Sequence, residues 1–129
     1  MRDMVVGLVI EFFLGINLVT FGAFTPGGKP QTPLRDWTLH FHEGIGWLLV
    51  LTAIVVFIFA IKRPAEKRML TATIGLIGVA VAITGGEMTE VQSLIKYAIF
   101  LMATGVIIGL ISYMAGYLKS SPTLPPVTQ

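Results

Sequence analysis

Four stretches of this sequence carry few charged side chains, and each is long enough, or nearly so, to cross a lipid bilayer as a helix. They are residues 4–24, 37–61, 69–85 and 91–118. A membrane-spanning helix needs about 20 mostly apolar residues. Only 12% of the 129 residues are charged and 54% are hydrophobic, whereas a soluble domain carries about 25% charged residues. The pattern predicts an all-α fold, an integral membrane four-helix bundle whose first partner is the lipid bilayer.

The segments between these stretches are short, so residues 1–119 are predicted to form a single four-span domain. Residues 25–35 hold three prolines and two glycines, which indicates a loop. Residues 62–68 are predicted to form a charged turn and residues 85–90 a short polar turn. The proline-containing tail, residues 120–129, is expected to be flexible.

The distribution of Lys and Arg predicts how the bundle lies in the membrane, because cytoplasmic loops carry an excess of these residues. One side is predicted to hold six of the nine: Arg2, Lys62, Arg63, Lys67, Arg68 and Lys119. The other side holds Lys29, Arg35 and Lys96. The bias predicts a multi-pass protein of the cell (plasma) membrane with up-down-up-down topology and both termini in the cytoplasm.

Several function classes are disfavoured by what the sequence lacks. It has no cysteine, which excludes disulfides, thiolate metal sites and covalently attached c-type haem. A net charge of +2 is too small to favour nucleic acid as a partner. Ser93 and Ser112 have no histidine at the same predicted depth, and neither a P-loop nor a dinucleotide-binding fingerprint is present. Hydrolytic activity is therefore not expected, and whether the protein is an enzyme stays open.

Small residues recur every three or four positions along the predicted helices. One stripe consists of Thr71, Gly75, Gly78, Ala82 and Gly85, and another of Ala98, Met102, Gly105, Gly109, Ser112 and Gly116. Small side chains let membrane helices approach closely, so four-helix packing is the more common interpretation. The glycines could also make room for a flat cofactor such as haem, and Gly105 with Gly109 could instead join two protomers.

Glu11 lies about 10 Å inside the first predicted span at 1.5 Å per residue. Together with Asn17 it would interrupt the apolar core of a signal peptide, so this helix is interpreted as retained. A lone charged carboxylate at this depth is costly. Proton relay, contact with a quinone headgroup or ligand binding would explain it, and so would a hydrogen bond between helices, with Thr71 or Ser112 as the expected partner. These interpretations carry equal weight.

His40 and His42 are the only histidines, at the head of the second predicted span. His42 lies on the inward stripe with Gly46 one turn later, which predicts a cofactor ligand beside a space for a porphyrin. If the helix began after His40, that side chain could turn towards His42 and Glu87 or Glu90 and form a site for zinc, copper or iron. The alternative is that both histidines are ordinary polar groups at the membrane surface.

The spacing His42-x-x-x-Gly46 resembles the haem-ligating helices of small membrane b-type cytochromes and of half the haem A synthase bundle. Together with the run from Glu11 to Asn17 and the Gly85-Gly86-Glu87-Met88 segment, it also resembles a set of small four-helix bacterial and archaeal membrane proteins. The resemblance implies haem b, held by His42. Those cytochromes place a second histidine on another helix, which this chain lacks. The sixth ligand would therefore be Met88 or Met102, or a histidine of a second protomer.

Three functions follow as hypotheses. The first is an electron-transfer module that binds haem b or a quinone, with Glu11, His42, Gly46 and Met88 as cofactor-binding residues. A single transition-metal ion held by His40, His42 and Glu87, or no cofactor, is the alternative. The second is a structural subunit of a larger respiratory or oxygenase membrane complex, with a homo-oligomer or other membrane subunits as partners. The third is a carrier of protons or small ions centred on Glu11.

Overall fold

The computed structural model describes residues 2–20, 33–62, 66–89 and 91–118, and within them the secondary structure is entirely helical. The long helices are α1 (Arg2–Thr20), α2 (Pro33–Lys62), α3 (Glu66–Met88) and α4 (Ile95–Leu118), and a short 3-10 helix, η1 (Gln92–Leu94), precedes α4. Each of α1 to α4 contains a segment long and apolar enough to cross a membrane. The prediction of an all-α protein with four such helices is confirmed.

Two helices are longer than predicted. α2 begins at Pro33, so residues 33–35 are helical rather than part of a loop; proline is favoured in the first turn of a helix because its fixed φ is already helical. α3 runs from Glu66 to Met88 and takes in much of both predicted turns, since Glu, Lys and Arg are good helix formers. The predicted end of the first span at residues 21–24 and the flexible tail lie outside the described residues.

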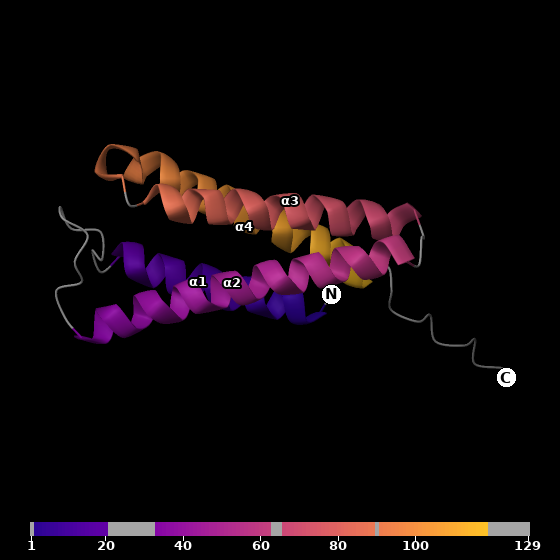
Figure 1. Ribbon diagram of the computed structural model, residues 1–129, viewed down its shortest axis with the longest axis horizontal. Coiled ribbons are helices and arrows are strands. Elements are labelled where there is room, and N and C mark those ends of the chain that lie inside the picture. Colours follow the sequence, from indigo (N-terminus) through magenta and orange to yellow (C-terminus); the bar gives the residue numbers. More distant parts are fainter. Residues whose placement is uncertain (1, 21–32, 63–65, 90, 119–129) are drawn as a thin grey trace, which may run out of the picture.

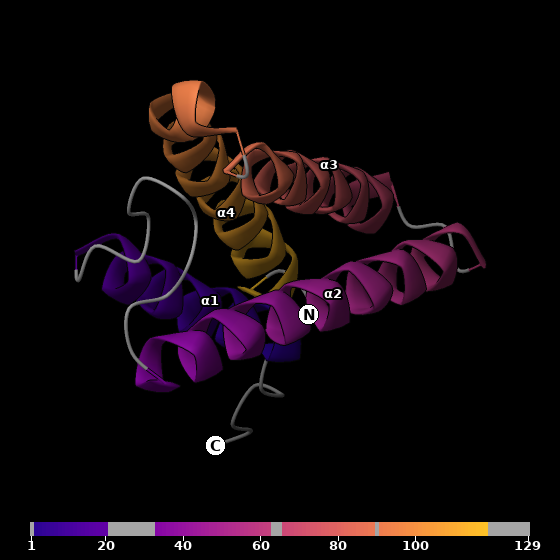
Figure 2. The same cartoon turned by 60° about the vertical axis from the view of Figure 1, so that its left-hand side comes forward.

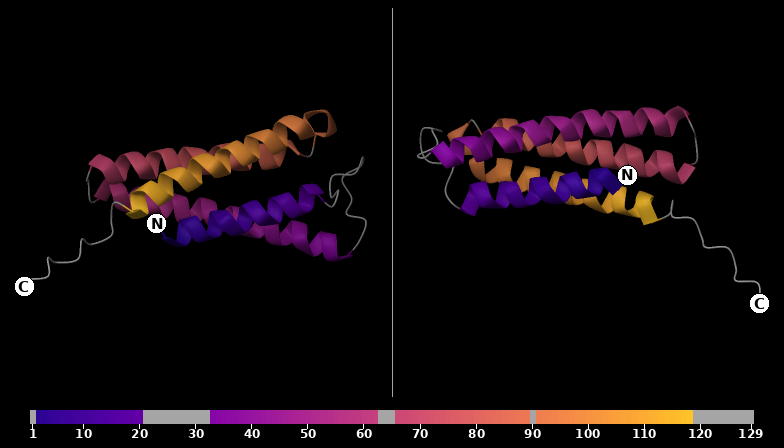
Figure 3. Two further views of the ribbon diagram at one scale, coloured as in Figure 1. Left: turned by 180° about the vertical axis from the view of Figure 1, so that it is seen from behind. Right: turned by 90° about the horizontal axis from the view of Figure 1, so that it is seen from below.

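Helices that follow one another in the chain are also neighbours in space. α1 contacts α2, α2 contacts α3, α3 contacts α4, and α4 returns to α1 (Figures 1 and 2). The contact between α3 and α4 is the most extensive of the four. Views from behind and from below show the same arrangement of α3 with α4 and α1 with α2 (Figure 3).

The bundle has a small apolar core and an apolar exterior. The core cluster consists of Met4, Leu8, Leu49, Ala53, Val79, Val106 and Tyr113. Large apolar side chains are exposed on every long helix, including Phe13, Leu51, Ile77 and Ile111. Helices that are apolar on all sides, inward and outward, are typical of membrane spans. The structure therefore supports a multi-pass membrane protein.

Glycines bring the backbones of α3 and α4 into direct contact; we call Gly78, Gly85, Gly105 and Gly109 the α3–α4 seam. A Cβ placed on Gly78 would lie 2.7 Å from N of Gly109 and 2.8 Å from O of Gly105. A Cβ on Gly85 would lie 2.6 Å from N of Met102. The seam leaves no space for a flat cofactor between these two helices, and its glycines are buried within the chain. The contacts at these four glycines support the packing interpretation of the two stripes.

Two further contacts join α4 to α3 near the other end of the seam. Oγ of Ser112 donates a hydrogen bond of 2.6 Å to O of Thr71. The Tyr113 ring lies over Gly75, where a Cβ would come within 2.5 Å of it. Thr71 and Ser112 thus pair with each other, and the expectation that one of them is the partner of Glu11 is wrong.

Candidate functional site

The partner of Glu11 is His42. Nδ1 of the imidazole lies 2.8 Å from Oε1 of the carboxylate, and the two side chains are 18% and 11% exposed. The two atoms are at ion-pair distance, but the N–H direction is not aligned for a hydrogen bond, and among the described residues Oε2 of Glu11 has no hydrogen-bond partner. The Glu11–His42 pair therefore joins the middle of α1 to the first half of α2.

Two glycines lie beside the pair, and the lack of a side chain at Gly46 is what the close approach requires. A Cβ on Gly46 would lie 3.3 Å from Oε1 of Glu11, and a Cβ on Gly15 would lie 3.6 Å from Cε1 of His42. Each glycine is four residues after the pair member on its own helix, so it shares a helix face with that residue. The space left by Gly46 receives the Glu11 carboxylate in this structure.

Gly46→Ala is expected to weaken the Glu11–His42 pair, because the carboxylate would have to move by a few tenths of an ångström. We expect a loss of about 1 kcal/mol in the free energy of unfolding, within the usual range for overpacking. Gly44→Ala on the same helix is the control, since a Cβ there would meet nothing within 4 Å. Unfolding in a mild detergent with increasing SDS measures both; equal stability of the two variants would contradict the assigned contact.

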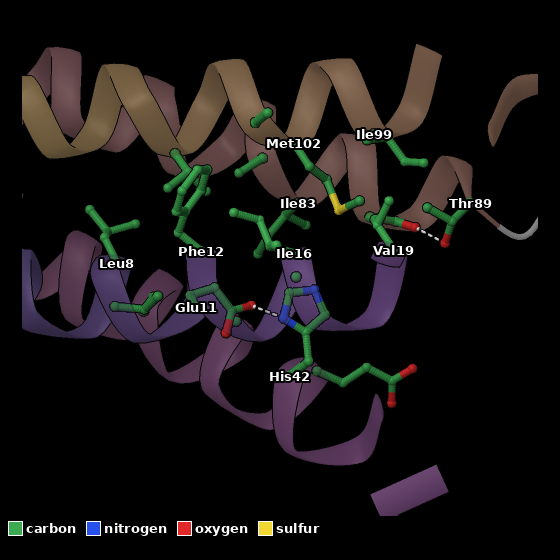
Figure 4. Close-up of a pocket in the computed structure, with 18 of the residues that line it drawn as sticks. Leu8, Glu11, Phe12, Ile16, Val19, His42, Ile83, Thr89, Ile99 and Met102 are labelled. Carbon is green, nitrogen blue, oxygen red and sulfur yellow. Dashed lines mark hydrogen bonds and ion pairs between the residues drawn. The ribbon is translucent and has the colours of Figure 1, made fainter. Parts of the chain in front are cut away.

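The pair lines a cavity of about 310 Å³ that all four long helices enclose. It lies between the second half of α1, the first half of α2, the end of α3 and the first half of α4. Each helix contributes apolar residues to the wall, among them Phe12, Leu39, Ile83 and Val106. Figure 4 shows Phe12 and Ile83. Ligand pockets have volumes of about 300–1,000 Å³, so the cavity is large enough for a small organic group.

The ionisable groups of the wall are acidic apart from His42. Glu43 of α2 and Glu87 of α3 line the cavity together with Glu11, and the described lining contains neither Lys nor Arg. Oε2 of Glu43 lies 3.5 Å from Nδ1 of His40 at the exposed side of α2. The lining therefore favours a neutral or cationic ligand over an anionic one.

Met102 of α4 reaches into the cavity from the side opposite α2. In Figure 4 its sulfur lies towards the imidazole of His42. Gly85 of α3 makes room for this side chain, because a Cβ there would lie 2.9 Å from Cγ of Met102. Gly86 lies beside the sulfur, and a Cβ there would make an ordinary contact of 3.8 Å with Sδ. Met88, the other candidate ligand, is not among the lining residues.

The structure brings some of the predicted site residues together in the cavity and leaves others outside it. Glu11, His42, Gly46 and Glu87 line one cavity, whereas His40 does not. Because α2 begins at Pro33, His40 is held in the helix two residues before His42 and cannot turn freely towards it. Among the described residues there is no group of three or more His, Cys, Asp or Glu side chains that could hold a metal ion. Glu90 lies outside those residues.

Sequence reasoning singled out Glu11 and His42 separately and missed that they meet. The predicted depths placed Glu11 nearer the cytoplasmic side and His42 at the outer end. One signal was available: both residues are followed by a glycine four positions later. When each of two neighbouring helices has a polar residue followed by a glycine one turn later, the small glycines let the two polar side chains meet inside a membrane.

A comparison with known protein families, with curated proteins and with solved structures finds no match to this chain.

Proposed function

We propose that this protein binds the headgroup of a membrane quinone, as the quinone or the hydroquinone, at the imidazole of His42. The observation that carries the proposal is the Glu11–His42 contact of 2.8 Å through Nδ1. With Nδ1 beside the carboxylate, the other ring nitrogen, Nε2, is turned into the cavity (Figure 4). The imidazole thus presents one polar atom, Nε2, to a cavity whose other polar lining includes carboxylates and whose wall is mostly apolar.

A single imidazole can serve both redox forms of the headgroup. When neutral with its hydrogen on Nδ1, the ring accepts a hydrogen bond at Nε2 from a hydroquinone hydroxyl. When protonated, it donates one from Nε2 to a quinone carbonyl. A carboxylate beside Nδ1 holds the ring in this orientation. Glu11 would therefore act as a positioning residue.

The apolar part of the wall suits the rest of such a molecule. Ile16 and Trp47 line the cavity and are also exposed on the outer surface of the bundle. The wall is thus continuous with the surface that lipid would cover. This arrangement supports a ligand whose ring occupies the cavity while its hydrocarbon tail lies in the bilayer.

Haem b, which the sequence resemblance implies, remains the alternative occupant. His42 and Met102 are the cavity residues that could hold its iron. The two propionates of haem, however, would enter a wall with three carboxylates and no Lys or Arg in its described part. That charge supports a neutral headgroup, and we expect protein purified in mild detergent to show no Soret absorption band.

The placement of the cavity supports the proposed topology. Its wall combines the second half of α1, the first half of α2, the end of α3 and the first half of α4, as an up-down-up-down bundle would. From the excess of Lys and Arg on one side of the bundle, both termini would be cytoplasmic and the cavity would lie in the outer half of the plasma membrane.

Two other roles stay predictions: a subunit of a larger complex and a proton carrier at Glu11. Co-purification with other subunits would favour the first, and proton flux in proteoliposomes would favour the second.

Quenching of Trp47 fluorescence tests quinone binding, because Trp47 lines the cavity and Trp37, the second tryptophan, does not. A Trp37→Phe variant, which keeps only Trp47, is titrated with a short-chain benzoquinone in detergent. We expect saturable quenching with one quinone per chain. The matched Trp47→Phe variant should show only the linear quenching of a freely exposed indole. Linear quenching in both variants would refute the proposal.

Glu11→Gln is expected to weaken quinone binding about fivefold while the helices stay folded. The amide keeps the shape of the side chain but removes the negative charge beside Nδ1 of His42, and a loss of about 1 kcal/mol in binding corresponds to about fivefold in the dissociation constant. The same titration measures the dissociation constant. Glu87→Gln, a matched change in the same wall outside the Glu11–His42 pair, should stay within about twofold of the wild type; a larger effect there than at Glu11 would contradict the assignment.

A further inference from the structure

The thioether of Met102 has no role in the quinone site proposed above, yet the side chain packs closely against α3. Its side chain extends from α4 over Gly85, where a Cβ would crowd it, and its sulfur lies beside Gly86. It enters the cavity on the side opposite His42 (Figure 4). An unbranched methionine could have lain along the apolar wall. Here its sulfur lies towards an imidazole.

An imidazole nitrogen and a thioether sulfur form a donor pair with a definite preference. Thioethers select soft metal ions, above all Cu(I), whereas imidazole accepts several metals. Harder ions such as Zn²⁺ and Mg²⁺ need more nitrogen or oxygen donors, and no group of three such side chains occurs among the described residues. The donors at hand therefore fit a soft ion of low coordination number.

The surroundings fit a cation as well. Histidines that bind metals almost always place their other ring nitrogen beside a carboxylate or a carbonyl, which fixes the orientation of the ring. Glu11 occupies that position, 2.8 Å from Nδ1 of His42. Two further carboxylates and no Lys or Arg belong to the described wall, so a positive ion meets no repulsion there.

We propose that the cavity binds one soft monovalent metal ion, Cu(I), between Nε2 of His42 and Sδ of Met102, with Glu11 behind the imidazole. The flexible methionine side chain can adjust to the distance that the ion requires. This site goes beyond the quinone proposal and is independent of it. Because both ligands use Nε2 of His42, their binding would be mutually exclusive.

Ag(I), a soft monovalent ion that does not change oxidation state under these conditions, is the probe. Competition with a chromophoric chelator measures its affinity for the full-length protein in detergent. We expect one Ag(I) per chain. Met102→Leu, which nearly conserves volume, should bind at least about tenfold more weakly, and Glu11→Gln about 10- to 100-fold more weakly. Met88→Leu is the matched control, since Met88 does not line the cavity, and should bind as the wild type does.

Circular dichroism confirms that each variant is folded, and X-ray absorption at the silver edge should show one sulfur and one nitrogen neighbour. The proposal is overturned if the wild type binds no Ag(I), if Met88→Leu loses as much affinity as Met102→Leu, or if Zn²⁺ binds as tightly as Ag(I). A silver environment without sulfur would overturn it as well.

Discussion

His42→Phe is expected to weaken quinone binding at least about 100-fold. The substitution removes the one polar atom that the imidazole presents to the cavity, and it leaves the buried Glu11 carboxylate without its partner. A hydrogen bond to a charged group contributes about 1.5–3 kcal/mol, and about 2.7 kcal/mol corresponds to 100-fold. Trp47 quenching in the Trp37→Phe background measures the dissociation constant.

The double variant Glu11→Leu/His42→Phe separates binding from folding. Removing both polar partners is far less costly than removing one, because no buried charge is left unpaired. We therefore expect the double variant to be more stable than His42→Phe alone and still unable to bind quinone. If its binding returned along with its stability, His42 would have only a packing role.

Gly105→Ala is expected to destabilise the bundle by about 3 kcal/mol, at the upper end of the range for overpacking. A Cβ there would lie 2.5 Å from O of Gly78 and would also meet the backbone N of Ala82. Backbone atoms cannot turn away as a side chain can, so α3 and α4 would have to separate along the seam.

Gly44→Ala is again the control, since its Cβ would enter open space. Alanine is the better helix former at both positions, so the difference between the variants reports the seam alone. SDS-induced unfolding followed by circular dichroism gives both free energies. Equal stabilities would mean that α3 and α4 do not touch at Gly105.

The helices were predictable because bilayer thickness and hydropathy determine them. The ends of the helices were less predictable, because charged residues such as Glu66 and Lys62 can lie either inside a helix or beyond its end at a membrane surface. Proline led to an error in the same direction: Pro33 was assigned to a loop, yet it begins α2. Composition alone does not distinguish a helix start from a loop in such a segment.

The site was predictable only residue by residue. Glu11 and His42 each stood out as polar groups in apolar helices, but which side chains meet depends on the offset of α1 against α2, and one sequence does not determine that offset. For the same reason, the sequence favoured Met88, at the predicted level of His42, over Met102 as the second ligand. In the structure Met102 lines the cavity and packs against Gly85, whereas Met88 does not line the cavity.

Imidazole ¹⁵N NMR tests the central claim most directly, because this chain has only two histidines and one of them is an internal control. Protein labelled at His40 and His42 is reconstituted in lipid and titrated with a short-chain benzoquinone and then its hydroquinone. The Nε2 resonance of His42 should shift with each ligand, in opposite senses for donated and accepted hydrogen bonds, while both nitrogens of His40 stay unchanged. Quinone binding at the Glu11–His42 pair would be contradicted if the His42 chemical shifts did not change with either ligand, or if the His40 chemical shifts changed by the same amount.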